Sequence, residues 1–132
     1  MKYSEKLRDP RWQKKRLEIL ERDERKCQSC FDYTSTLAVH HRIYIKGKEP
    51  WDYPNEHLVT LCENCHAQEM EERSECEQSL LEELRKHYFA LDIYQISQGL
   101  FDGGLKPLID QYLKDAWEET GRRARGLNVT TS

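Results

Sequence analysis

The chain has 132 residues, of which 34% are charged and 37% are hydrophobic, and its formal net charge is −3. This length allows one domain, or one small domain with an appendage, and a thin core that a bound metal would help to hold. No apolar run approaches the roughly 20 residues that a membrane-spanning helix needs. The basic N-terminus lacks the apolar segment of a signal peptide. We therefore expect a cytoplasmic protein with no membrane partner.

Charge is unevenly distributed along the chain. Residues 1–48 contain 13 Lys and Arg against 7 Asp and Glu, a net charge of +6. Residues 49–95 contain 3 against 12, a net charge of −9, and residues 96–132 balance at 5 and 5. A basic first part is compatible with a surface that faces phosphates, and solvated helix faces explain the same counts equally well.

The first predicted element is a short amphipathic helix from Asp9-Pro10 to about Arg25. Asp9 can cap the free N–H groups of the first turn, and Pro10 lacks an N–H that would be unpaired there anyway. The apolar side chains that recur at helical spacing are Trp12, Ile19 and Leu20. The basic side chains between them either contact nucleic-acid phosphates or form an ordinary exposed face: Lys14, Lys15, Arg16 and Arg22.

Two short strands are predicted in the middle of the chain. Residues 36–45 are rich in β-branched and aromatic side chains and indicate a strand, or a strand and the start of its return. A turn at residues 46–48 and an irregular loop with two prolines at residues 49–54 follow. Residues 57–61 form the second short apolar run.

The remainder of the chain is predicted to be helical. A long helix is expected from about Asn64 to about Ala90, with Cys76 as a small buried side chain on its apolar face. Residues 98–104 contain three glycines and indicate a break. A second amphipathic helix follows from Leu105 to near Gly121, and residues 122–132 are predicted to be a frayed basic tail.

Four cysteines have the spacing of a structural zinc site. Two Cys-x-x-Cys pairs are separated by 31 residues, and two such pairs can meet at one tetrahedral ion. All four positions would then be filled by protein, so no position is left for a reactive water. The expected ligands are Cys27, Cys30, Cys62 and Cys65.

Three histidines lie close to these cysteines in the sequence. His40 and His41 point to opposite faces if they lie in a strand, so both cannot serve one metal in simple extended geometry. They can still flank one scissile phosphate at a strand end. A metal held by His40 and His66 would leave open positions for phosphate oxygens and water, and a nearby neutral imidazole could take a proton from that water. Packing roles for these histidines are the alternative.

Residues 37–42 (LAVHHR) and 58–66 (LVTLCENCH), preceded by Cys27-x-x-Cys30, resemble the HNH endonuclease family with its ββα-metal fold. Residues 44–54 (YIKGKEPWDYP) are similar to those of small HNH proteins of bacteria and phages. The resemblance covers about residues 5–70. It implies hydrolysis of phosphodiester bonds that leaves 5′-phosphate and 3′-hydroxyl ends.

The resemblance also implies a role for each matching residue. His40 and His66 would hold a divalent metal such as Mg²⁺, His41 would act as the general base, and the four cysteines would hold Zn²⁺. The family usually has Asn directly before the Leu of its Leu-x-x-Leu-Cys motif, and this chain has His57 there. Either His57 or Asn55 could orient the base, or the site could be degraded. The basic residues expected at nucleic acid are Lys14, Lys15, Arg22, Arg42, Lys46 and Lys48.

Together these features predict a small α+β protein: a zinc-stapled HNH domain over residues 1–70 and a helical extension over residues 71–132. The expected function is a metal-dependent endonuclease acting on DNA, with RNA not excluded. The alternative is a zinc-stabilised module that binds nucleic acid or protein without the chemistry. The helices of the extension either pack back on the zinc domain or pair with a second copy or another protein.

Overall fold

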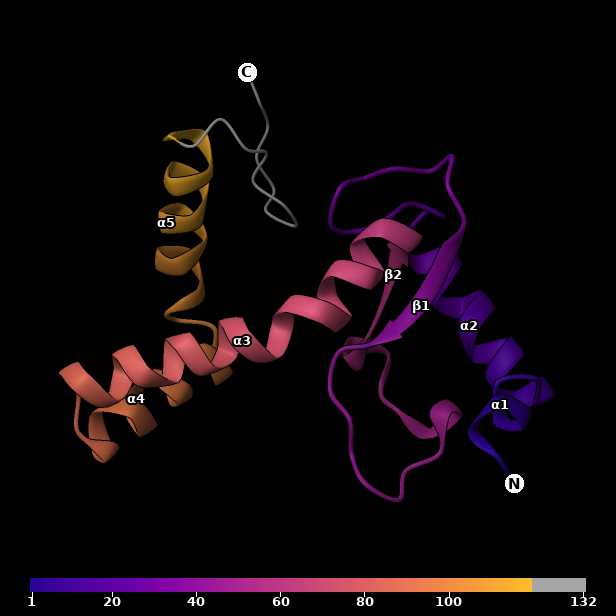
Figure 1. Cartoon of the computed structure of the whole chain (residues 1–132), viewed down its shortest axis with the longest axis horizontal. Coiled ribbons are helices and arrows are strands. Elements are labelled where there is room, and N and C mark those ends of the chain that lie inside the picture. Colours follow the sequence, from indigo (N-terminus) through magenta and orange to yellow (C-terminus); the bar gives the residue numbers. More distant parts are fainter. Residues whose placement is uncertain (120–132) are drawn as a thin grey trace. The chain divides into compact units, whose positions relative to one another are not determined.

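The computed structural model describes residues 1–119 of the chain, which form a mostly helical α+β structure with one two-stranded antiparallel sheet (Figure 1). The chain divides into two compact units, Met1–Glu69 and Met70–Ser132. In the first unit, the short helix α1 (Tyr3–Lys6) precedes α2 (Pro10–Arg22), followed by β1 (Leu37–His41) and β2 (Leu58–Cys62). Helix α3 (Glu63–His87) begins directly after β2, so the two strands and the start of this helix are consecutive.

Strand β1 pairs with β2 in an antiparallel register that places His40 opposite Val59 and His41 opposite Leu58. The strand is shorter than the predicted residues 36–45, because the chain bends directly after His41. The connection to β2 contains two short 3₁₀ helices, η1 (Pro50–Asp52) and η2 (Asn55–His57). The predicted loop over residues 49–54 therefore contains one short helical turn.

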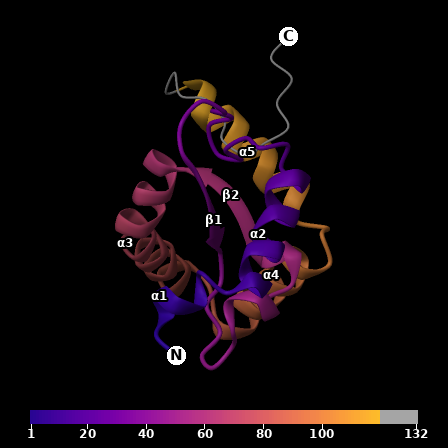
Figure 2. The same ribbon diagram turned by 90° about the vertical axis from the view of Figure 1, so that its right-hand side faces the viewer.

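Helix α2 begins where the sequence predicts, because the Asp9 side chain accepts a hydrogen bond from the backbone N–H of Arg11 at 2.8 Å. The helix ends at Arg22, three residues before the predicted end. Its buried residues Trp12 and Ile19 pack with Tyr53 and Leu58 on one side of the sheet, and the helix lies along the two strands in Figure 2. A second buried cluster comprises Cys27, Val59, Leu61, Cys62 and Cys65.

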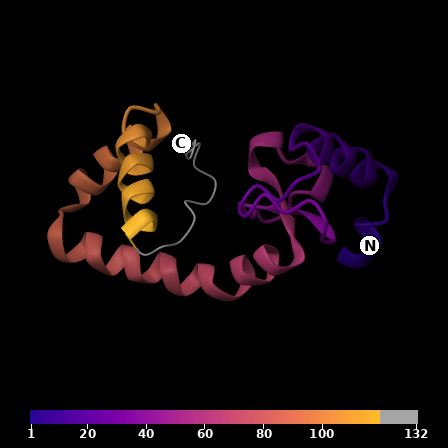
Figure 3. The ribbon, with the colours of Figure 1, turned by 90° about the horizontal axis from the view of Figure 1, so that it is seen from above.

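The helical extension contains one helix more than predicted. Helix α3 is uninterrupted from Glu63 to His87 (Figure 3). A new helix, α4 (Ala90–Phe101), begins after Phe89, whose backbone N–H is capped by the Asp92 carboxylate at 3.0 Å. The predicted break at residues 98–104 is too long, because α4 continues through Gly99 to Phe101, and helix α5 (Lys106–Glu119) begins after residues 102–105.

The prediction that Cys76 is buried is wrong. Cys76 is exposed, as are all the residues of α3 from Met70 to Glu83. None of the described residues 70–119 is buried, so this segment has no closed core into which Cys76 could point. The predicted basic tail at residues 122–132 lies outside the described residues. Within the described part of the chain, no helix is both long enough and apolar enough to cross a membrane.

Candidate functional site

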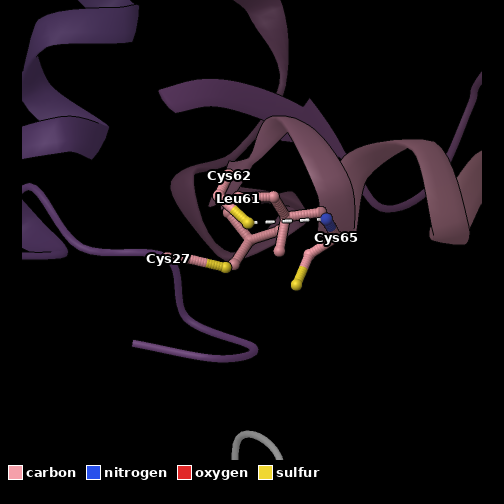
Figure 4. Close-up of a cluster of buried hydrophobic side chains, with 5 residues drawn as sticks. Cys27, Leu61, Cys62 and Cys65 are labelled. Atoms are coloured by element: carbon pink, nitrogen blue, oxygen red, sulfur yellow. Dashed lines mark hydrogen bonds between the residues drawn. The ribbon is translucent and has the colours of Figure 1, made fainter. Parts of the chain in front are cut away.

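Four cysteine sulfurs gather between the end of α2 and the start of α3. Cys27 and Cys30 come from the turn after α2, Cys62 ends β2, and Cys65 lies in the first turn of α3. All four sulfur atoms lie within 4.8 Å of one another, and the sulfurs of Cys30 and Cys62 are 3.7 Å apart. Figure 4 shows the sulfurs of Cys27, Cys62 and Cys65 close together beside α3. The sequence prediction that these four residues converge is confirmed.

The cluster fits a tetrahedral metal ion. A Zn–S bond of about 2.3 Å places two sulfurs of a tetrahedron about 3.8 Å apart, close to the separation of Cys30 and Cys62. Burial by itself raises the pKa of Cys27, but surrounding backbone N–H groups outweigh it and lower that pKa to about 7. Burial and the neighbouring Cys62 raise the pKa of Cys65 to about 12. A cation is therefore needed to keep all four side chains as thiolates.

Each cysteine turn is shaped by its own backbone. The N–H of Cys30 donates to the sulfur of Cys27 at 3.5 Å, and the N–H of Cys65 donates to the sulfur of Cys62 at 3.4 Å. Phe31 follows the first turn with a φ of 66°, in the left-handed region where glycine is usual. The turn therefore keeps its geometry even though a phenylalanine occupies the usual glycine position.

Arg22 and Asp23 tie the end of α2 to β2, a connection that the sequence did not reveal. The guanidinium of Arg22 donates to the carbonyl oxygens of Asn55 and Leu58, both at 2.6 Å, and to the Asp23 carboxylate at 2.9 Å. The same carboxylate accepts the backbone N–H of Thr60 at 2.9 Å. The Arg22 guanidinium is therefore already bonded to three groups within the protein. The expected contact of Arg22 with nucleic acid stays a prediction.

The buried Asp23 carboxylate is held in its charged form. Burial by itself raises the pKa of Asp23, but hydrogen bonds from Arg22 and Thr60 outweigh it and hold this pKa below the usual range. Its contribution to stability is therefore fully present above the unfolded-state pKa of about 3.9 and is lost only as the pH falls through the lower folded-state value.

We expect Asp23→Asn to lower the free energy of unfolding by about 1–3 kcal/mol, because it weakens hydrogen bonds to a charged group. The difference from wild type should be constant between pH 6 and pH 8, since Asp23 stays charged throughout that range. Urea unfolding of the metal-loaded wild type and variant measures this difference in the free energy of unfolding. Glu21→Gln, which removes an exposed ion pair with Arg25, is the matched control and should change stability by less than about 1 kcal/mol. A difference that shrinks from pH 8 to pH 6 would contradict this assignment.

His40 and His66 are brought together on the α3 side of β1. Their ring centroids are 5.1 Å apart, and the ring planes are inclined by 73°. His40 is buried near the end of β1, whereas His66 is half-buried in the first turn of α3, directly after Cys65. Among the described residues, only the four cysteines form a group of three or more ligands close enough to hold a metal. A metal on the histidine pair would therefore take further ligands from substrate and water.

His41 lies on the other face of β1. Its ring stacks on Trp12 at a centroid distance of 5.0 Å and meets Tyr53 edge-on at 4.7 Å. The ring atom Nε2 is 3.1 Å from the carbonyl oxygen of Pro50. Because a carbonyl oxygen only accepts, Nε2 carries the hydrogen, and Nδ1 is the basic nitrogen of the neutral ring. Burial lowers the pKa of His41, although the bond to Pro50 partly opposes this shift, so the ring is neutral near pH 7.

The two candidates for orienting His41 occupy different positions. The His57 ring lies 6.4 Å from Tyr53, which also contacts His41. The Nδ1 atom of His57 is buried and has no hydrogen-bond partner in the described part of the chain. Asn55 is exposed, and its backbone carbonyl oxygen accepts a hydrogen bond from the Arg22 guanidinium. Tyr53 thus lies beside both His41 and His57, and its proximity to them was not predicted from sequence.

The remaining predicted nucleic-acid residues are mostly exposed. Lys14 projects from α2 into solvent and Lys15 is half-buried, whereas Arg42, Lys46 and Lys48 are all exposed in the segment after β1. The ammonium group of Lys48 also lies 5.7 Å from the centre of the Tyr53 ring. Arg42, Lys46 and Lys48 thus place three exposed cations in the segment that immediately follows His41.

Comparison with protein-family models, curated proteins and solved structures finds no match to this chain. The class of protein is therefore inferred from the residues and their arrangement.

Proposed function

We propose that this protein is a metal-dependent endonuclease of the HNH type that hydrolyses phosphodiester bonds in DNA. The observation that carries the proposal is the pairing of His40 with His66 beside a four-cysteine cluster at the junction of β2 and α3. The order β1–β2–α3 agrees with a ββα-metal core. Zn²⁺ at the four cysteines would have a structural role, and His40 and His66 would hold a second divalent metal such as Mg²⁺.

The chemistry is divided among the three histidines. A divalent metal at His40 and His66 would supply stabilisation of negative charge on the phosphate and the leaving oxygen. His41 takes the proton of the attacking water at Nδ1, while Pro50 holds the opposite side of its ring. Strand β1 ends at His41. A phosphate bound at this strand end can therefore lie between His41 on one face of the strand and the pair His40 and His66 on the other. His57 or Asn55 would orient His41.

Incubation of supercoiled plasmid with the purified protein and Mg²⁺, Mn²⁺ or Ni²⁺ tests the proposal. We expect nicking that depends on added metal and is lost in His40→Ala and His66→Ala, while both variants retain their zinc. The exposed His87 on α3 supplies the matched control, since His87→Ala should cleave like wild type. Absence of cleavage by folded, zinc-loaded protein with every metal would reject the nuclease.

A binding module without catalysis is the second candidate. It is favoured by His57 at the usual Asn position, where the buried Nδ1 lacks a partner, and by the burial of His41 against Trp12. His57→Asn separates the two candidates. If wild type is inactive because this position is degraded, the variant should gain metal-dependent cleavage.

The helical extension is proposed to pair with a second copy or another protein. None of its described residues is buried, and large apolar side chains on α4 remain open to solvent, with Phe101 86% exposed. Leu91, Tyr94 and Phe101 share one face of this helix by their spacing. Sedimentation measures the molar mass in solution. If the extension pairs with a second copy, the wild type should be a dimer that Phe101→Glu dissociates. A monomeric wild type, with the same mass as Phe101→Glu, would reject self-association.

A cytoplasmic location remains part of the proposal.

A further inference from the structure

The segment that follows β1 presents an apolar surface between cations. Every residue from Arg42 to Lys48 is exposed, and this segment contains no acidic residue. Three consecutive large apolar side chains, Ile43, Tyr44 and Ile45, lie between Arg42 on one side and two lysines on the other. We call residues 42–48 the post-strand loop. Consecutive exposed apolar side chains of this kind mark interaction sites.

The post-strand loop is held in its shape by the domain. The backbone N–H of Arg42 donates to the carbonyl oxygen of His57 at 2.7 Å. The hydroxyl of Tyr53 accepts the N–H of Ile45 at 2.9 Å. The N–H of Lys48 donates to the carbonyl oxygen of Ile45 at 3.1 Å, and Gly47 closes this turn with a φ of 84°. Because the loop is already shaped, less ordering is needed when it binds a partner.

Tyr44 connects the loop to the candidate base. Its ring centroid lies 5.8 Å from that of His41, yet 64% of Tyr44 is exposed. A planar group stacked on Tyr44 would therefore lie beside His41.

The chemistry of the loop matches a nucleic-acid strand with an accessible base. Nucleobases stack on aromatic rings whatever their sequence, and apolar wedges such as Ile insert between base steps and partly unstack them. The charged groups of Arg42, Lys46 and Lys48 would meet the phosphates on either side. Glu49, the nearest following acidic residue, is paired with Lys6 at 2.8 Å and does not offset these charges.

We propose that the post-strand loop is a base-unstacking wedge, with Tyr44 stacking on an exposed base, Ile43 and Ile45 filling the opened step, and Arg42, Lys46 and Lys48 holding the flanking phosphates. The preferred substrate is then DNA with an interrupted base stack, such as a bulge, rather than uniform duplex. This inference rests on the proposed nuclease function and names its substrate class.

Binding is measured without added Mg²⁺, Mn²⁺ or Ni²⁺, so that its result does not depend on cleavage. Fluorescence anisotropy compares a labelled DNA duplex carrying a central two-nucleotide bulge with the same duplex without the bulge. We expect the wild type to bind the bulged duplex more tightly. Tyr44→Ala should lower affinity for the bulged duplex about 5- to 150-fold, the range for loss of one base–aromatic stack. Affinity for the uniform duplex should change less than about 3-fold.

Tyr33→Ala is the matched control, because Tyr33 is also an exposed tyrosine but lies near the first cysteine turn. It should bind both duplexes like wild type, and Tyr44→Trp should retain the preference. Zinc content and the thermal midpoint report folding of each variant. Equal affinity of wild type for the two duplexes, or an unchanged preference in folded Tyr44→Ala, would overturn the wedge.

The wedge and the nuclease can fail separately. Tyr44-dependent preference for the bulge without cleavage under any metal would keep the wedge and reject the nuclease. Metal-dependent plasmid cleavage without a preference for the bulge would keep the nuclease and reject the wedge.

Discussion

Replacement of Cys62 by Ser is expected to abolish zinc binding and to unfold the unit Met1–Glu69. Cys62 contributes to both the sulfur cluster and the buried core around it. Structural zinc binding supplies roughly 10–16 kcal/mol of apparent free energy in small zinc domains, more than a core of this size supplies alone. Loss of one thiolate therefore removes most of the stability of the unit.

Two measurements check this prediction. Native mass spectrometry should find one zinc ion per wild-type chain and none in Cys62→Ser, and circular dichroism should show loss of the cooperative thermal transition. Cys76→Ser is the matched control, because Cys76 is the exposed fifth cysteine. It should match wild type in both measurements. Full zinc content and an unchanged transition in Cys62→Ser would show that the cluster does not stabilise the fold.

His41→Gln should lower metal-dependent DNA cleavage by about 10²–10⁴-fold, the usual contribution of a general base. The glutamine amide can still donate to the Pro50 carbonyl, but it cannot accept a proton as imidazole does. The substitution thus tests basicity more cleanly than His41→Ala, which would also leave a cavity against Trp12 and Tyr53.

Single-turnover cleavage, with the protein in saturating excess over the DNA, measures this effect without a contribution from product release. DNA affinity and zinc content should stay within about 3-fold of wild type, because the base acts on water rather than on binding. A fully active, zinc-loaded His41→Gln protein would exclude His41 as the base. A parallel loss of zinc or of the thermal transition would instead assign His41 a structural role beside Trp12.

The features that could be predicted from sequence depend on residues only a few positions apart. The Asp9-Pro10 helix start and the Cys-x-x-Cys turns are local geometries, and both agree with the structure. The alternation of side chains in β1 likewise anticipates that His40 and His41 contact different partners. The end of the long helix near Ala90 was predicted, but helix α4 was missed, because its start is marked by a cap from Asp92 rather than by a glycine or proline.

The sequence by itself determined the cysteine cluster, because two tight turns of soft ligands have few other ways to satisfy their sulfurs. It also determined the amphipathic helix α2, whose predicted apolar residues are the ones that the structure buries. Only the tertiary structure decided that Arg22 reaches carbonyl groups beside β2, that Trp12 covers His41 and that Cys76 stays exposed. Such contacts join residues more than 25 positions apart, or depend on the lack of a neighbour, and no short-range pattern encodes either condition.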